Sequence, residues 1–167
     1  MATYIKIASV TVGSGGASSV AFSSIPATYT DLLMKLSIRG SGAVTNESFY
    51  IDVNGAGYGG TRRALYGTGS AAGSDNQAAL RWDYFTGNSG TGNTFGSGEL
   101  YIPNYRSANY KSMSMEGVAE GNTSGMFMAM TAALWSSTSA ITSLSLTGLN
   151  GNIAQYSTAT LYGISNA

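Results

Sequence analysis

Hydrophobic and polar residues alternate along many short segments of this chain, as they do in β-strands with one buried face. The clearest segment is 31–39, which has apolar residues at every second position. Successive side chains of a strand point to opposite faces of its sheet. We therefore expect a central strand with a solvated outer face and four residues directed into the core: Leu32, Met34, Leu36 and Ile38.

The start of the chain predicts two strands joined by a glycine-rich turn. In 4–12 the apolar residues change parity, and one extra residue near Ala8 and Ser9, a β-bulge, would keep them on one face. Residues 20–22 alternate again after the turn. The pattern indicates a hairpin that is closed by the Ile-Pro pair that follows, because proline lacks the donor that a central strand needs.

Two further strand pairs follow from the same kind of pattern. Alternation at 49–53 predicts an antiparallel neighbour for 31–39. The closing stretch, 141–164, alternates around Leu144 and Leu146, passes through Gly and Asn turn residues, and ends in a second strand-like run. We expect a hairpin there, whose apolar face must join a larger sheet.

The middle of the chain, about 55–98, is rich in glycine, which lowers the cost of sharp turns and weakens regular elements. We expect long loops there, interrupted by short strands near 63–66 and 79–85. A helix is the alternative to a strand at 126–135, where the alternation is less regular. The later strands are expected at 99–102, 111–119 and 126–135.

Short strands about ten residues apart, separated by turn signals, are typical of a β-sandwich or barrel. We interpret the chain as all-β, an antiparallel β-sandwich of jelly-roll type. Its 167 residues fit a single domain, 1–167, with a long Gly-rich loop region at about 55–98.

The composition removes several classes of function. The chain has no histidine and no cysteine, and so lacks the usual general base, the commonest metal ligand and any thiolate. Eight basic residues balance eight acidic ones, so no net charge attracts nucleic acid or an anionic membrane. The N-terminus lacks the basic start and apolar core of a signal peptide, which indicates cytoplasmic synthesis. No cofactor and no metal are expected.

Two patterns resemble motifs of ligand binding or catalysis without their full context. Residues 55–60 satisfy GxGxxG, but that mechanism needs a helix N-terminus next, and 61–67 is strand-like. A glycosidase needs two suitably separated carboxylates. No local motif selects such a pair, and we expect no enzyme activity; the acidic candidates are Asp52, Asp83, Glu99, Glu116 and Glu120.

Aromatic residues concentrate in the glycine-rich region and just after it. In a β protein they can pack in the core or across strands, contact a protein partner, or stack on sugar rings. Core packing is the commonest of the three roles, and the sequence leaves all three open. The residues that we assign to a candidate interface are Tyr58, Trp82, Tyr84, Tyr101 and Tyr105.

Four stretches carry a resemblance to a known group of proteins: VTVGSGGASSVAFSSIPATYTDLLMKLSIR at 10–39, LYGTGSAAGS at 65–74, GELYIPNYRSANYKSMSMEG at 98–117, and LWSSTSAITSLSLTGLNGNIAQYSTATLYGI at 134–164. Together they resemble small virion proteins of tailed phages, especially phages of cyanobacteria and other aquatic bacteria. These stretches are structural rather than catalytic, and the rest of the glycine-rich region does not match.

The resemblance implies a non-enzymatic virion component that is made in the host cytoplasm. One expectation is a capsid decoration (cement) protein that binds the capsid lattice, and with it the major capsid protein or another virion protein. Such a protein would act as a homo-oligomer, and a trimer suits the local three-fold positions of a capsid. The alternative is a tail or head fibre module that binds a host-surface glycan.

Overall fold

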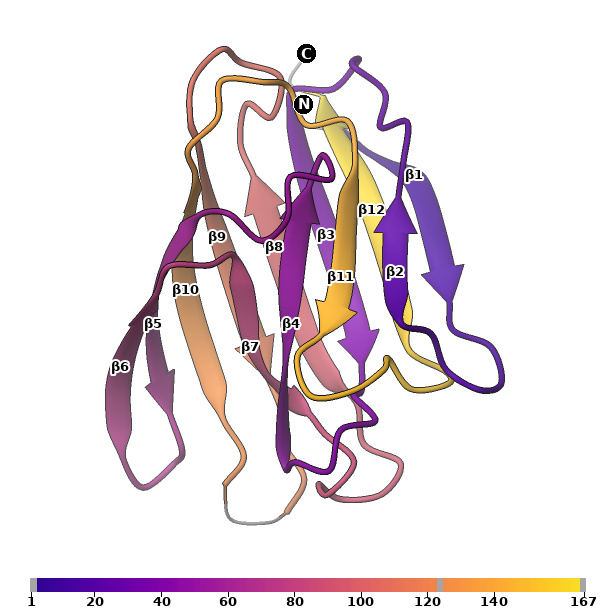
Figure 1. Cartoon of the computed structure of the whole chain (residues 1–167), viewed down its shortest axis with the longest axis vertical. Helices are drawn as coiled ribbons and strands as arrows, with labels where there is room; N and C mark the ends of the chain where they lie inside the picture. The colour runs from indigo at the N-terminus through magenta and orange to yellow at the C-terminus, as the bar shows by residue number, and fades with distance from the viewer. Residues whose placement is uncertain (1–2, 123–124, 166–167) are drawn as a thin grey trace.

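The computed structural model describes residues 3–122 and 125–165, which form two packed antiparallel sheets (Figure 1). None of these residues is helical, so the all-β, antiparallel sandwich prediction is confirmed. The eight-stranded sheet has the order β1-β12-β3-β8-β9-β10-β5-β6, and the four-stranded sheet has the order β2-β11-β4-β7. The strands are β1 (Thr3–Thr11), β2 (Ser19–Phe22), β3 (Asp31–Ile38), β4 (Asn46–Val53), β5 (Thr61–Gly67), β6 (Ala72–Gln77), β7 (Arg81–Thr86), β8 (Gly96–Ile102), β9 (Lys111–Val118), β10 (Met128–Trp135), β11 (Leu144–Gly148) and β12 (Thr158–Ser165).

The chain passes from one sheet to the other at most of its turns. β1 pairs with β12, β2 with β11, β3 with β8 and β4 with β7, so early strands pair with late strands in reverse order. The three predicted strand pairs, at 4–22, 31–53 and 141–164, are therefore wrong as pairs, although each strand exists. Alternation records that one face of a strand is buried, and it says nothing about which strand lies beside it.

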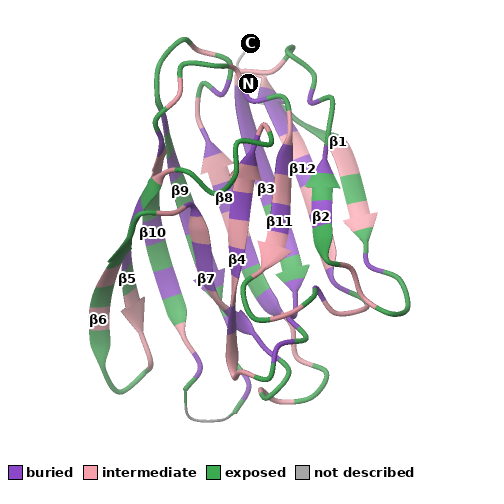
Figure 2. Ribbon diagram, in the orientation of Figure 1, coloured by how far each residue is buried: buried purple, intermediate pink, exposed green. Residues whose placement is uncertain are grey.

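The core lies between the two sheets (Figure 2). The four predicted core residues of β3 are at most 5% exposed, which confirms the face assigned to that strand. Leu144 and Leu146 on β11 face them from the smaller sheet and are also buried, as predicted. The solvated outer face is confirmed at Lys35 and Ser37 only. Leu33 and Arg39 are buried, and Leu33 lies between its cross-strand neighbours Tyr162 and Tyr101.

Two β-bulges interrupt the regular pairing. The β1–β12 register shifts between Lys6 and Ala8, close to the predicted bulge. In β7, Trp82 lies opposite Phe49 while Phe85 lies opposite Glu47, so β7 carries one extra residue. The extra residue lets both Trp82 and Phe85 face the core, where both are buried, although they are three positions apart.

The glycine-rich region is more regular than expected. The short strands expected near 63–66 and 79–85 are present as β5 and β7, which confirms them, but β6 lies between them where a loop was expected. β6 has no apolar alternation because it is an edge strand whose inward residue, Asp75, forms ion pairs. The GxGxxG stretch at 55–60 is a turn between β4 and β5, and the strand that follows supplies no helix N-terminus.

We expect Leu36→Ala to lower the free energy of unfolding by about 2–5 kcal/mol, through lost burial and a residual cavity. Ser37→Ala is the matched control, since Ser37 lies next to it on the exposed face of β3 and should change stability by less than about 0.5 kcal/mol. Denaturant titration measures both. Equal effects of the two substitutions would show that the core face of β3 is assigned wrongly.

Candidate interaction surface

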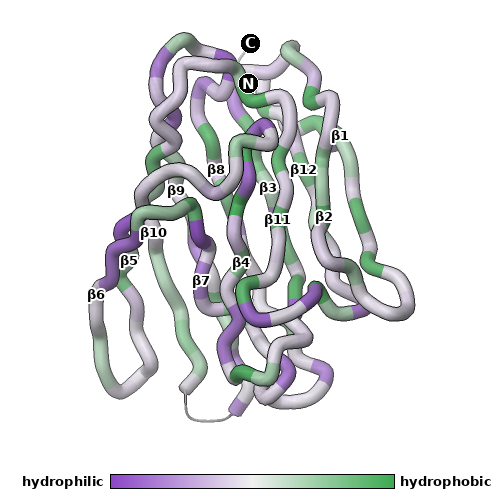
Figure 3. The backbone as a smooth tube through the Cα atoms, viewed as in Figure 1, coloured by the Kyte–Doolittle hydropathy of each residue, from purple (hydrophilic) through white to green (hydrophobic). Residues whose placement is uncertain are grey.

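The outer face of the eight-stranded sheet carries a group of exposed apolar side chains, which we call the outer-face patch. Its members are Leu65, Val118, Met128 and Met130. Strand register brings them together, because Met130 lies opposite Leu65, and Met128 lies opposite Val118. Met130 and Leu65 are 70% and 68% exposed, and hydrophobic residues follow one another along β10 (Figure 3). Single exposed apolar residues are common on protein surfaces, whereas a contiguous group of them often marks an interaction site.

A groove of about 770 Å³ lies beside Leu65 and Met130 of the patch. Its walls come from β5, β6, β9 and β10, and include Leu65, Met130, Arg63, Asn76 and Ser114. Every side chain in this lining is aliphatic, small or polar, and none is aromatic. The groove therefore offers apolar contact together with hydrogen-bonding groups, and no flat ring on which a sugar could stack.

Two charged residues of opposite sign flank β10 on this face. Glu116 on β9 lies directly opposite Met130, and Arg63 on β5 lies directly opposite Ala132. Both side chains are exposed, and neither forms an ion pair with another described residue. Each charge is therefore available to a partner that covers the patch.

A third charged residue, Glu99, lies beside Glu116 and forms an ion pair within the chain. Glu99 and Glu116 are directly opposite each other on β8 and β9, where like charges repel. The Lys35 ammonium lies 2.8 Å from the Glu99 carboxylate. The hydrogen bond and the charge of Glu99 raise the pKa of Lys35, and the more distant charge of Glu116 adds to this effect. Glu99 is therefore the acid that Lys35 holds directly, while Glu116 forms no ion pair with a described residue.

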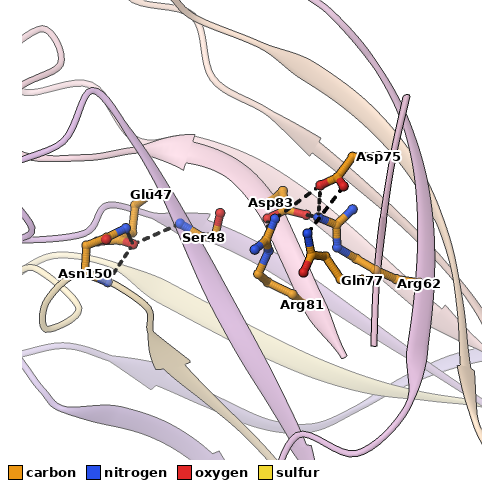
Figure 4. A network of polar contacts seen from close by, with 8 residues as sticks. All are labelled: Glu47, Ser48, Arg62, Asp75, Gln77, Arg81, Asp83 and Asn150. Carbon is orange, nitrogen blue, oxygen red and sulfur yellow. Dashed lines mark hydrogen bonds and ion pairs between the residues drawn. The ribbon is translucent and has the colours of Figure 1, made fainter. Parts of the chain in front are cut away.

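The inner face behind the patch is held by a buried ion network between β5, β6 and β7 (Figure 4). The Nη2 atom of Arg62 lies 2.6 Å from Oδ2 of Asp75 and 2.7 Å from Oδ2 of Asp83. Arg81 joins the network through Nε, 2.6 Å from Oδ1 of Asp83. The side chains of Arg62 and Asp83 are 0% and 1% exposed, so their charges depend on each other.

Asp75 lies at the solvent side of this network. Burial alone would raise its pKa, but the hydrogen bond and the charge of Arg62 outweigh that effect and lower the pKa below its ordinary value of 3.8. The ionised form is therefore favoured in the folded protein.

An aromatic cluster continues the inner face beyond the ion network. Tyr84 stacks on Phe127 with ring centres 4.6 Å apart, and Tyr66 packs edge-on against Phe127 at 5.7 Å. Tyr84 is the bulge residue of β7 and has a φ of 67°, an uncommon value for a residue other than glycine. Burial raises the pKa of its hydroxyl, which stays protonated at neutral pH.

A second buried carboxylate, Glu47 on β4, lies apart from the ion network in Figure 4. Its Oε1 accepts hydrogen bonds from the backbone nitrogen of Ser48 at 2.9 Å and from Nδ2 of Asn150 at 2.9 Å. Because it joins β4 to the loop after β11, its role is to fix that loop.

The structure separates the five predicted interface residues. Trp82 and Tyr105 lie in the core, at 1% and 0% exposure, so their assignment to an interface is corrected: they pack inside the domain. Tyr84 belongs to the inner aromatic cluster. Tyr101 is half-buried and donates a hydrogen bond to Oδ2 of Asp31, at 2.9 Å, while Tyr58 is exposed and stacks on Tyr50.

The residues that form the outer-face patch were missed because the alternation along 126–135 has two apolar parities. Met128 and Met130 have one parity, and Ala129 and Ala133 have the other. The structure buries the alanines and exposes the methionines, because β7 packs closely on the inner side of β10. The small size of the residues at alternate positions was the signal that a close neighbour covers that face.

Two of the acidic catalytic candidates have structural partners in the described part of the chain. Asp83 is bound in the ion network, and Glu120 accepts hydrogen bonds from the backbone of Gly121 and Asn122. Within residues 3–122 and 125–165, no three acidic, His or Cys residues are close enough together to hold a metal ion. No described segment is a helix long and apolar enough to cross a membrane.

Comparison of the chain with protein-family models, with curated proteins and with solved structures found no match.

We expect Arg62→Ala to lower the free energy of unfolding by about 3 kcal/mol. That is the lower end of the range for a broken buried ion pair, because Arg81 still pairs with Asp83. Arg63→Ala removes the same side chain from the next position of β5, on the exposed face, and should cost less than about 0.5 kcal/mol. Thermal or denaturant unfolding measures the stability of both variants. Equal stabilities would contradict the stabilising role of the ion network.

The lowered pKa of Asp75 predicts a loss of stability in acid. Its folded pKa is below its unfolded value, so the stabilisation is fully present above the unfolded pKa and is lost as the pH falls through the folded one. We expect the unfolding free energy of the natural protein to fall more steeply below about pH 4 than that of Asp75→Asn. If the unfolding free energies of the two proteins fell in parallel as the pH is lowered, the pairing of Asp75 with Arg62 would contribute nothing to stability.

Proposed function

We propose that this protein is a non-enzymatic structural component of a phage virion, a capsid decoration protein that binds the capsid lattice as a homo-oligomer and stabilises the shell. The outer-face patch is the observation that carries the proposal. A lone monomer gains nothing from a sheet face with Leu65 and Met130 about two-thirds exposed, whereas a subunit of an assembly buries them.

The strand connections are compatible with a virion role. We infer that the sandwich is a jelly roll, because β1 to β4 pair with β12, β11, β8 and β7 in that nested order. In this reading, β5, β6, β9 and β10 are additions that widen one sheet. Jelly rolls occur in viral capsid proteins and in lectins, so the fold is compatible with the proposal and does not decide it.

A trimer that binds the major capsid protein or another virion protein is the form of assembly that we propose, in line with the resemblance to small phage virion proteins. The low fraction of charged residues, 10%, suits a chain whose surface is covered by other subunits. Its site of action would be the virion, after synthesis in the host cytoplasm.

A fibre module that binds a host-surface glycan is the second candidate, and one groove favours it. This groove, of about 360 Å³, lies on the outer face at the other end of the large sheet. It is lined by Tyr4, Tyr162 and Leu33, with the Lys35–Glu99 ion pair at its side. Aromatic rings beside charged hydrogen-bonding groups are suited to sugars.

Immunogold labelling of phage particles that carry a tagged copy of the chain tests the proposal. We expect the label over the head, and particles that lack the chain should lose their DNA at a lower temperature. Label confined to tail or head fibres, with binding of the purified protein to host cells that Tyr4→Ala weakens, would favour the glycan-binding alternative. Absence of the label from purified particles would contradict both.

A further inference from the structure

We propose that the outer-face patch binds a second copy of this chain, and that Glu116 of each copy pairs with Arg63 of the next. This inference rests on the proposed function as an assembling protein, and it assigns the surface and the ion pair through which copies join.

Charge placement identifies the partner as another copy. The strand order β9-β10-β5 sets Glu116 on one side of the exposed methionines of β10 and Arg63 on the other. A rotation axis parallel to β10 and passing above it brings β9 of one copy against β5 of the next. Every Glu116 then approaches an Arg63, so the surface is complementary to itself.

The register of the strands makes this contact reachable. Glu116 lies in the row of Met130 and Leu65, and Arg63 lies in the next row, two residues along β5. Two residues of a strand span roughly 7 Å, a distance that the side chains of Arg and Glu together can bridge. The methionines of β10 lie nearest the axis, where they contact each other and lose their exposure to water.

The local chemistry distinguishes a second copy from other partners. Sugars often stack on aromatic rings, and the groove beside Leu65 and Met130 has none, although Tyr101 lines the hollow next to Glu116. A strongly charged partner would need a surface of one sign, whereas this surface presents one acid and one base. A partner that covers this surface pairs both exposed charges if it places a base opposite Glu116 and an acid opposite Arg63. A second copy of the chain presents one charge of each sign on this face.

The surface is also held in shape before a partner arrives. The buried network of Arg62, Asp75 and Asp83 fixes β5 and β6 to β7 from the inner side. A surface that is already ordered loses less conformational entropy on binding, so a small patch can support a specific contact.

Charge reversal tests the pair directly. We expect Glu116→Arg and Arg63→Glu each to weaken self-association by about tenfold or more, because each places like charges opposite each other. The double variant E116R/R63E restores the opposite charges and should assemble as the natural protein does. Analytical ultracentrifugation of the full chain at about 1–100 µM measures each dissociation constant, and circular dichroism verifies the fold.

Mixing the two single variants reports the symmetry of the assembly. In an equimolar mixture each Glu116→Arg chain can pair fully with an Arg63→Glu chain, so a two-fold assembly recovers as a heterodimer. A three-membered ring cannot alternate two kinds of chain, and it recovers only in the double variant. Either recovery supports the proposal.

Lys6→Glu is the matched control. It makes the same change of charge on the same outer face, on β1 at the far end of the sheet, and should leave self-association unchanged. A natural protein that stays monomeric throughout this range, or single reversals no weaker than Lys6→Glu, would overturn the inference. The proposed function fails separately, if the chain assembles through this pair but is not found in virions.

Discussion

The large sheet of this protein is twice as wide as the sheet that covers it, and the rest of the structure depends on how the uncovered end is closed. β7 is the last strand of the cover on that side, and it packs on β8, β9 and β10. β5 and β6 extend beyond it, as Figure 1 shows. Their inner face meets β7 through the Arg62 ion network and through the cluster of Tyr66, Tyr84 and Phe127.

The bulge in β7 allows these contacts with β5 and β6 to form. It turns Asp83 toward Arg62 while Trp82 and Phe85 remain in the core. Ion pairs and aromatic contacts thereby cover the inner side of β5 and β6. Each of these contacts depends on one particular partner residue, so β5 is fixed beside β10. On the outer side the same alignment sets Leu65 beside Met130 and produces the patch. The interaction surface is thus a consequence of how the wide sheet is supported from within.

Much of the fold followed from the sequence, because alternation identifies strands and their buried faces from local pattern alone. β3 is the clearest case, with all four core residues predicted. Strand neighbours could not be predicted, since β1 and β2 have the same pattern whether they share a sheet or face each other across the core. β6 was also missed, because its inward residue is Asp75, and a polar residue gives no apolar alternation.

The candidate surface was harder to predict than the fold. Aromatic residues suggested an interface, yet Trp82 and Tyr105 fill the core, where large rings stabilise the packing of two sheets. The exposed members of the patch are aliphatic residues and methionines, which a sequence alone assigns to a core. Only the register across β9, β10 and β5 shows that they meet on one outer face between Glu116 and Arg63.

Methionine oxidation followed by mass spectrometry tests most directly whether another copy covers this face. Met128 and Met130 are 60% and 70% exposed in the single chain, whereas Met113 and Met115 are both 2% exposed and serve as internal references. We expect hydrogen peroxide to spare Met128 and Met130 at concentrations where the chain is assembled, and to oxidise them on dilution. Oxidation of both at the same fast rate at every concentration would contradict the assignment of the patch to self-assembly.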